Sequence, residues 1–85
     1  MNLRDAQRAN CSFYQLVTAV QVQEALCISS GNEEFGPEET LDEGTVIAAP
    51  NVLPNGDFLL PVMPEEKLYR VLYPDDVEVE ETDFF

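Results

Sequence analysis

Carboxylates are the side chains in this sequence with the greatest capacity for chemistry. Of the 85 residues, 17 are Asp or Glu and 4 are Lys or Arg, which gives a net charge of −13. Residues 1–32 hold two arginines and two carboxylates, so the entire excess lies in residues 33–85. Paired carboxylates hydrolyse glycosides when a cleft fixes their separation, but a chain of this length does not predict such a cleft. We therefore interpret most of them as solvated surface charges that attract a basic partner.

The acidic residues gather in two groups, within 33–43 and within 75–83. Alternate side chains of a strand share one face about 7 Å apart, so Glu78 and Glu80 are predicted to project side by side. Such rows on a rigid scaffold resemble a line of phosphates and steer basic partners toward the protein. The predicted partner-binding residues are these two groups and the terminal aromatic pair: Glu33, Glu34, Glu38, Glu39, Asp42, Glu43, Asp75, Asp76, Glu78, Glu80, Glu81, Asp83, Phe84 and Phe85.

The residues required for most other catalytic and metal-binding chemistry are absent from the sequence. The chain contains no histidine, so a serine or cysteine nucleophile lacks its usual base and imidazole metal ligands are excluded. Its glycines are well separated and form no phosphate-binding loop. No register of the acidic segments fits the EF-hand pattern, although weak cation binding by residues 33–43 stays an alternative. We predict no catalytic residue, no cofactor and no specific metal site, and therefore a protein that is not an enzyme.

The two cysteines, Cys11 and Cys27, are predicted to be buried thiols that pack as small apolar groups. On one continuous helix they would lie about 24 Å apart along the axis. A disulfide cannot span that distance, so a bridge requires that this segment is not one helix.

The elements that position these groups begin with the N-terminal third. Residues 3–28 lack Gly and Pro, Asp5 is a candidate N-cap, and Ser29–Asn32 contains a glycine suited to end a helix. We therefore predict a helix over residues 1–31. A competing period-2 pattern places Tyr14, Leu16, Thr18, Val20 and Val22 on one side of a strand, and this alternative stays open.

The remaining residues indicate a loop followed by a sheet. Residues 32–44 contain two glycines and a proline among carboxylates, which predicts an acidic loop. Pro54–Asp57 places Asn-Gly between apolar runs, which predicts a hairpin. Residues 67–73 alternate with apolar side chains on both faces, as in a central strand, and residues 77–80 resemble an acidic edge strand.

Together these patterns predict one small α+β domain, with the N-terminal helix packed on an antiparallel sheet of about four strands. Its parts would be a helix at 1–31, an acidic loop at 32–44, β-hairpins at 45–81 and an acidic, aromatic tail at 82–85. No apolar stretch is typical of a signal peptide or a membrane span. We expect no membrane association, and a location in the cytoplasm of a host cell or in a virion.

Function is limited mainly by charge. Four basic residues cannot offset repulsion by a phosphate backbone, so we expect no direct contact with nucleic acid. In size and charge the chain resembles small acidic DNA-mimic inhibitors from phages and mobile elements. Its last eight residues resemble the tail by which single-stranded-DNA-binding proteins dock replication and repair enzymes, without the proline usual before the last phenylalanine.

These resemblances imply a non-enzymatic inhibitor that mimics nucleic acid and occupies the basic cleft of a DNA- or RNA-handling host protein. The alternative is a small structural or assembly protein, such as a virion component or adaptor. In that case the chain would form homo-oligomers with apolar residues such as Pro50, Leu53, Leu59 and Tyr73 buried between subunits.

Overall fold

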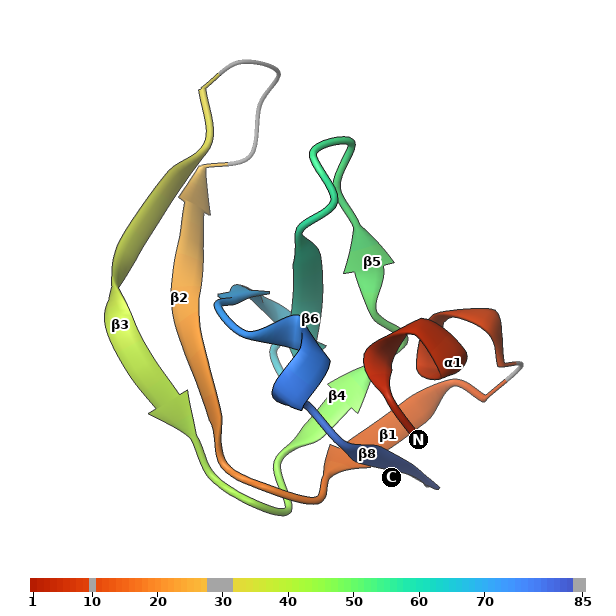
Figure 1. Cartoon of the computed structure of the whole chain (residues 1–85). Helices are drawn as coiled ribbons and strands as arrows, with labels where there is room; N and C mark the ends of the chain where they lie inside the picture. Colours follow the sequence, from red (N-terminus) through yellow and green to blue (C-terminus); the bar gives the residue numbers. More distant parts are fainter. Residues whose placement is uncertain (10, 28–31, 84–85) are drawn as a thin grey trace.

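The described part of the chain forms one curled antiparallel sheet with a single short α-helix near the N-terminus (Figure 1). The computed structural model describes residues 1–9, 11–27 and 32–83. The eight strands follow the order β3-β2-β7-β6-β4-β1-β8, and β5 pairs with β6 beside this path. The elements are α1 (Leu3–Arg8), β1 (Phe13–Leu16), β2 (Val20–Cys27), β3 (Glu34–Leu41), β4 (Val46–Ala48), β5 (Asn51–Val52), β6 (Phe58–Val62), β7 (Lys67–Val71), a 3₁₀ turn η1 (Pro74–Asp76) and β8 (Val79–Thr82).

The predicted α+β fold with a helix over residues 1–31 is wrong. The helix ends at Arg8 and is capped by the side chain of Asn2, while Asp5 lies in its first turn. From Phe13 the chain adopts the period-2 alternative as β1 and β2. The cause is the content of aromatic and β-branched residues, which pack well on a pleated surface paired on both sides. Four of the five side chains in that alternative pattern are buried: Tyr14, Leu16, Val20 and Val22.

The predicted acidic loop at 32–44 is also wrong over most of its length. Residues Glu34–Leu41 form β3, which pairs antiparallel with β2 from Val20↔Leu41 to Cys27↔Glu34. The ladder has two register shifts, and the first of them, between Gln23↔Glu38 and Ala25↔Phe35, accommodates Gly36 and Pro37. The prediction of about four strands failed for the same reason, because β1, β2 and β3 had been assigned to a helix and a loop.

Several predictions for the second half are confirmed. β5 and β6 are antiparallel neighbours joined by Leu53–Asp57, with Leu53 N–H donating to the Asp57 carbonyl at 2.8 Å. Gly56 has a φ of 94°, a conformation that favours glycine. β7 is a central strand between β2 and β6, and β8 is an end strand of the sheet, shifted to Val79–Thr82.

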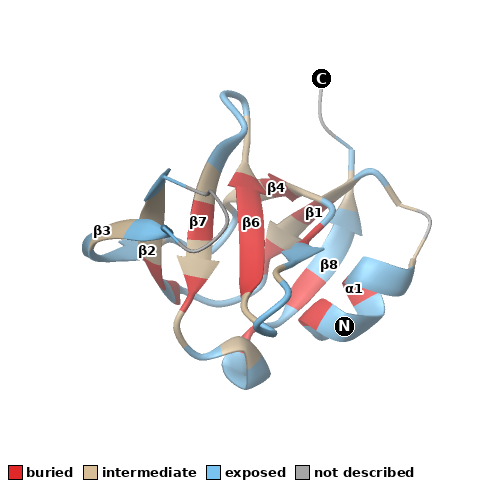
Figure 2. Cartoon of the chain, turned by 90° about the horizontal axis from the view of Figure 1, so that it is seen from above, coloured by how far each residue is buried: buried red, intermediate tan, exposed pale blue. Residues whose placement is uncertain are grey.

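The core lies inside the curl of the sheet, and α1 packs against it beside β1 and β8. Figure 2 shows buried segments along β6 and exposed ones along β3. Leu3 and Ala6 of α1 are buried against strand residues, and the hydroxyl of Tyr14 donates to the Ala6 carbonyl at 2.8 Å. The largest fully buried side chains are Tyr14, Leu3, Leu16, Ile47, Leu60, Val22, Val77 and Val79.

Candidate partner-binding surface

The first predicted group of carboxylates lies on β3 and its flanks. All six side chains are exposed: Glu33, Glu34, Glu38, Glu39, Asp42 and Glu43. A strand fixes their backbone spacing more tightly than the predicted loop would. The group is therefore presented on an ordered edge of the sheet.

The second group lies on η1, on β8 and beside them. These side chains are likewise exposed: Asp75, Asp76, Glu78, Glu80, Glu81 and Asp83. The predicted anchors Phe84 and Phe85 lie outside the described residues.

The structure does not bring the two groups together. β3 and β8 are the two ends of the strand order, and Figures 1 and 2 show them on opposite sides of the molecule. The acidic excess thus forms two separate surfaces, and a partner that contacts one need not contact the other.

The outer side of β3 carries backbone groups directed away from the sheet. The N–H of Leu72 donates to the Gln21 carbonyl at 3.1 Å, so the polar backbone groups of Gln21 face β7. Thr40 lies directly opposite Gln21, and such a residue turns its own N–H and carbonyl away from β2. Glu38, opposite Gln23, has the same orientation. No described strand pairs with this side of β3.

The outer side of β8 is partly covered by the chain's own N-terminus. The N–H of Val79 donates to the Met1 carbonyl at 2.9 Å, and the Met1 ammonium donates to the Val79 carbonyl at 2.8 Å. Asn2 forms an isolated antiparallel bridge with Glu78, whose carboxylate lies 3.5 Å from the ammonium. This edge is thus occupied where β8 begins.

Arg70 connects β3 to the rest of the sheet. Its guanidinium lies 3.7 Å from the centroid of the Phe35 ring on β3, and its Nη2 donates to the side-chain oxygen of Gln23 on β2. Nη1 lies 3.7 Å from a carboxylate oxygen of Asp57. Its Nε is buried and has no hydrogen-bond partner among the described residues. The planar guanidinium of this β7 residue therefore packs against side chains of β2 and β3.

Lys67 is also engaged within the sheet. Its ammonium lies 2.5 Å from the Glu24 carboxylate and 5.8 Å from the centroid of the Tyr69 ring. The hydrogen bond to Glu24 is the main cause of a raised pKa of Lys67. The two basic residues of the acidic half are thus held by Glu24, Asp57 and neighbouring rings, and they neutralise none of the predicted partner-binding carboxylates.

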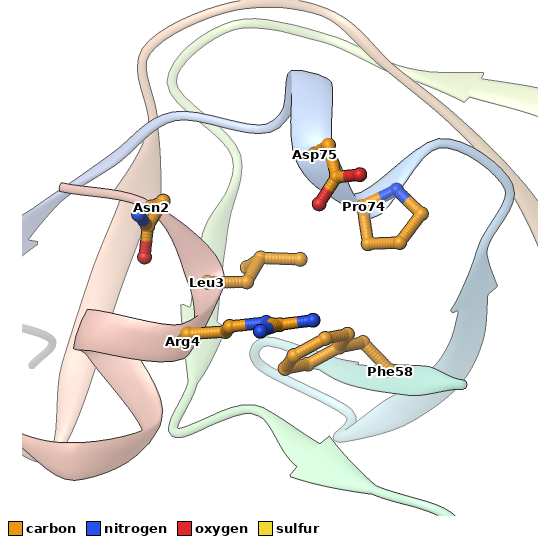
Figure 3. Close-up of a pocket in the computed structure, with 6 residues that line it drawn as sticks. All are labelled: Asn2, Leu3, Arg4, Phe58, Pro74 and Asp75. Carbon is orange, nitrogen blue, oxygen red and sulfur yellow. The ribbon is translucent and has the colours of Figure 1, made fainter. Parts of the chain in front are cut away.

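The two remaining basic residues, Arg4 and Arg8, form no ion pair with any described residue. They line a shallow pocket of about 270 Å³ together with Phe58. A smaller neighbouring pocket has a volume of about 70 Å³. Figure 3 shows its lining, in which Arg4 lies alongside the ring of Phe58 and Asp75 comes from η1. Neither pocket brings together a nucleophile and a base.

The cysteines carry no site. Cys11 is half-buried and its thiol donates to the Phe13 carbonyl at 3.0 Å, whereas Cys27 is exposed, so the prediction of two buried thiols is wrong for Cys27. The segment is not one helix, yet the two are not joined by a disulfide. Within residues 1–9, 11–27 and 32–83, no three acidic or cysteine side chains are grouped to hold a metal ion.

The acidic residues were predictable from the sequence, but the groups that organise them were not. Phe35, Arg70 and Thr40 were not predicted as site residues. Phe35 had one available signal, since it is a lone aromatic residue in an acidic segment. The outward direction of Thr40 depends on its pairing with β2, which no local pattern reveals.

A search of protein-family models found no match to this chain, and comparisons with curated proteins and with solved structures found none either. Among the described residues, no helix has the length and apolarity needed to cross a membrane.

Proposed function

We propose that this chain is a non-enzymatic inhibitor that binds a nucleic-acid-handling protein, occupying its basic cleft in place of nucleic acid. One observation carries the proposal: the carboxylates of β3 are exposed and fixed on a strand. They are also not neutralised by Lys67 or Arg70, because these two residues pair with Glu24 and Asp57. An unneutralised acidic strand attracts a basic surface over a distance of about 8–10 Å at physiological salt.

The charge arrangement suits fast recognition. Clefts lined with one sign of charge raise association rates by about ten- to a thousandfold with complementary partners. The long-range attraction depends on ionic strength, so a complex formed this way weakens as salt rises. Glu38 and Glu39 project to opposite faces of β3, which lets the edge meet both walls of a basic cleft.

The assembly alternative gains no support from burial. Pro50 and Leu59 are buried within the chain's own fold, so they are not free to line an interface between subunits, and Leu53 is half-buried. Among the four residues suggested for that role, Tyr73 is the one that is exposed, at 60%. We therefore propose the inhibitor alone.

The test is capture from a cell lysate on the immobilised chain at about 0.05 M and about 0.5 M salt. We expect nucleic-acid-binding proteins to be retained at low salt, released by added duplex DNA, and lost at high salt. Retention that is undiminished at high salt, or that DNA does not displace, would contradict the proposal.

Two charge variants localise the binding surface. Glu38→Gln with Glu39→Gln removes two charges from β3, and Glu80→Gln with Glu81→Gln removes two from β8. Because exposed charges each contribute up to about 1 kcal/mol, we expect the first pair to weaken capture by roughly tenfold. The second pair is the matched control, and we expect it to have a smaller effect.

A further inference from the structure

We propose that the outer edge of β3 binds an extended basic segment of the partner as an additional strand of the sheet. This inference rests on the proposed function and adds a binding mode to it. The site consists of the backbone of Glu38–Thr40 and the carboxylates beside it.

The backbone of β3 is oriented to pair with a further strand. Thr40 and Glu38 each direct an N–H and a carbonyl away from β2, and they are two residues apart, the repeat at which a further strand forms its bonds. Peptides that add to a sheet edge gain affinity from such main-chain hydrogen bonds and specificity from alternate side chains. At eight residues, β3 is twice as long as β8, and no described strand or terminus covers its outer side.

Charge selects the occupant. A long open edge is a template for pairing with any extended chain, and charged side chains on it prevent uncontrolled pairing. A second copy of β3 would place glutamates near glutamates, and like charges across a ladder are destabilising. An extended segment with lysines or arginines at alternate positions reverses the sign of that interaction. The edge therefore discriminates against its own copies and favours a basic strand.

The edge is also held in place before binding. The stacking of Arg70 on Phe35 and its bond to Gln23 connect β3, β2 and β7 on one face of the sheet. A preformed strand loses less conformational entropy on binding than a loop that must first order.

The test removes a backbone donor and keeps every charge. Proline at position 40 lacks the outward N–H, and proline is tolerated on edge strands when that N–H faces solvent. Thr40→Val is the matched control, since it keeps the N–H and loses only the hydroxyl. Unfolding of both variants by urea verifies that the fold is retained.

The probe is a synthetic peptide of about eight residues in which lysine and valine alternate. A second peptide has the same sequence with N-methylated backbone at alternate residues, so it keeps its charge and loses its strand donors. In fluorescence anisotropy at low salt, we expect Thr40→Pro and the N-methylated peptide each to weaken binding about fivefold or more, and Thr40→Val to have little effect.

The outcomes separate the two proposals. If Thr40→Pro binds both peptides as tightly as the unmodified chain does, the strand-addition inference is overturned, while the charge-based function stands on the lysate result. If the Pro variant fails to fold, the N-methylated peptide decides alone: equal affinity of the two peptides overturns the inference, and weaker binding of the methylated one supports it.

Discussion

The two edges of the sheet, β3 and β8, are both acidic and yet are protected from unwanted pairing in different ways. The outer backbone of β8 is engaged by Met1 at Val79, and its start is bridged by Asn2. No described strand or terminus pairs with the outer backbone of β3 along Glu38–Thr40, and this edge bears glutamates instead. Edge strands in natural proteins use both devices, coverage and charge.

This difference has a functional consequence. Coverage closes an edge to every partner, whereas charge closes it only to partners of the same sign. Two strands of similar composition thus differ in the structure, since β8 is bound by Met1 while β3 carries the edge that we propose for recognition.

The largest expected effect tests whether the strands next to β8 contribute more to the buried core than β3 does. Leu16 of β1 is 1% exposed and lies opposite Val79, whereas Leu41 of β3 is half-buried. Leu16→Ala should reduce the free energy of unfolding by about 2–5 kcal/mol through lost burial and a residual cavity. Leu41→Ala should cost about 1 kcal/mol, since less surface leaves water there. Urea unfolding measures both, and equal losses would contradict the asymmetry.

Tyr14→Phe tests the attachment of α1 to β1, the strand that pairs with β8. The hydroxyl bond to the Ala6 carbonyl is buried, so its removal leaves an acceptor unsatisfied and should cost about 1–3 kcal/mol. In hydrogen exchange we expect faster exchange in α1 and unchanged exchange in β3. An effect that spreads equally to β3 would show that the two sides are not separate.

The same tyrosine predicts a pH dependence. Burial raises the pKa of Tyr14 above its ordinary value of 10.0, and the contact with Glu24 raises that of Lys67 above 10.5. Both groups stay protonated in the fold at pH values where the unfolded chain releases protons. Their stabilisation is therefore complete below about pH 10 and is lost as pH rises through the raised values. Thermal unfolding from pH 7 to 11 should decline less steeply for Tyr14→Phe.

A smaller effect is expected from Asn2→Ala, which tests the cover over β8. The Asn2 side chain accepts from the Asp5 N–H at 2.9 Å, and its loss should cost about 1 kcal/mol as a missing N-cap. Because Asn2 adjoins Met1, we expect the amide of Val79 to exchange faster. Unchanged exchange at Val79 would show that the N-terminus does not depend on this cap.

The smallest effect is expected from Arg70→Lys, which tests how β3 is held. Lysine keeps the charge but loses the planar stacking on Phe35, at a cost of about 0.5–1 kcal/mol. The loss should appear as faster amide exchange in β3 with no change in β8. Phe35→Leu provides the complementary removal of the ring, and both variants should affect the same amides.

The parts of the fold that could be predicted from the sequence were those with local signals. The hairpin at Pro54–Asp57 and the alternation at residues 67–73 depend on adjacent residues. The prediction for the N-terminal third was wrong because a stretch without Gly or Pro is compatible with both helix and strand. The pairing of β1 with β4 and β8 favours the strand. That error extended to β3, whose partner had been assigned to a helix.

The candidate site was predictable in composition and not in organisation. The two acidic groups follow from the charge map alone. Which of their two strands is open depends on Met1 reaching Val79, a contact between residues 78 positions apart. Long-range pairing of this kind leaves no local pattern in the sequence.

Backbone amide hydrogen exchange, followed by NMR, is the decisive test of whether the outer edge of β3 is open and that of β8 is covered. In the isolated chain, we expect rapid exchange of the Glu38 and Thr40 amides and slow exchange of the Val79 amide. Addition of the alternating lysine–valine peptide should slow exchange at Glu38 and Thr40 and leave Val79 unchanged. Slow exchange at Thr40 without the peptide, or no response to saturating peptide, would contradict an open, charge-selective edge.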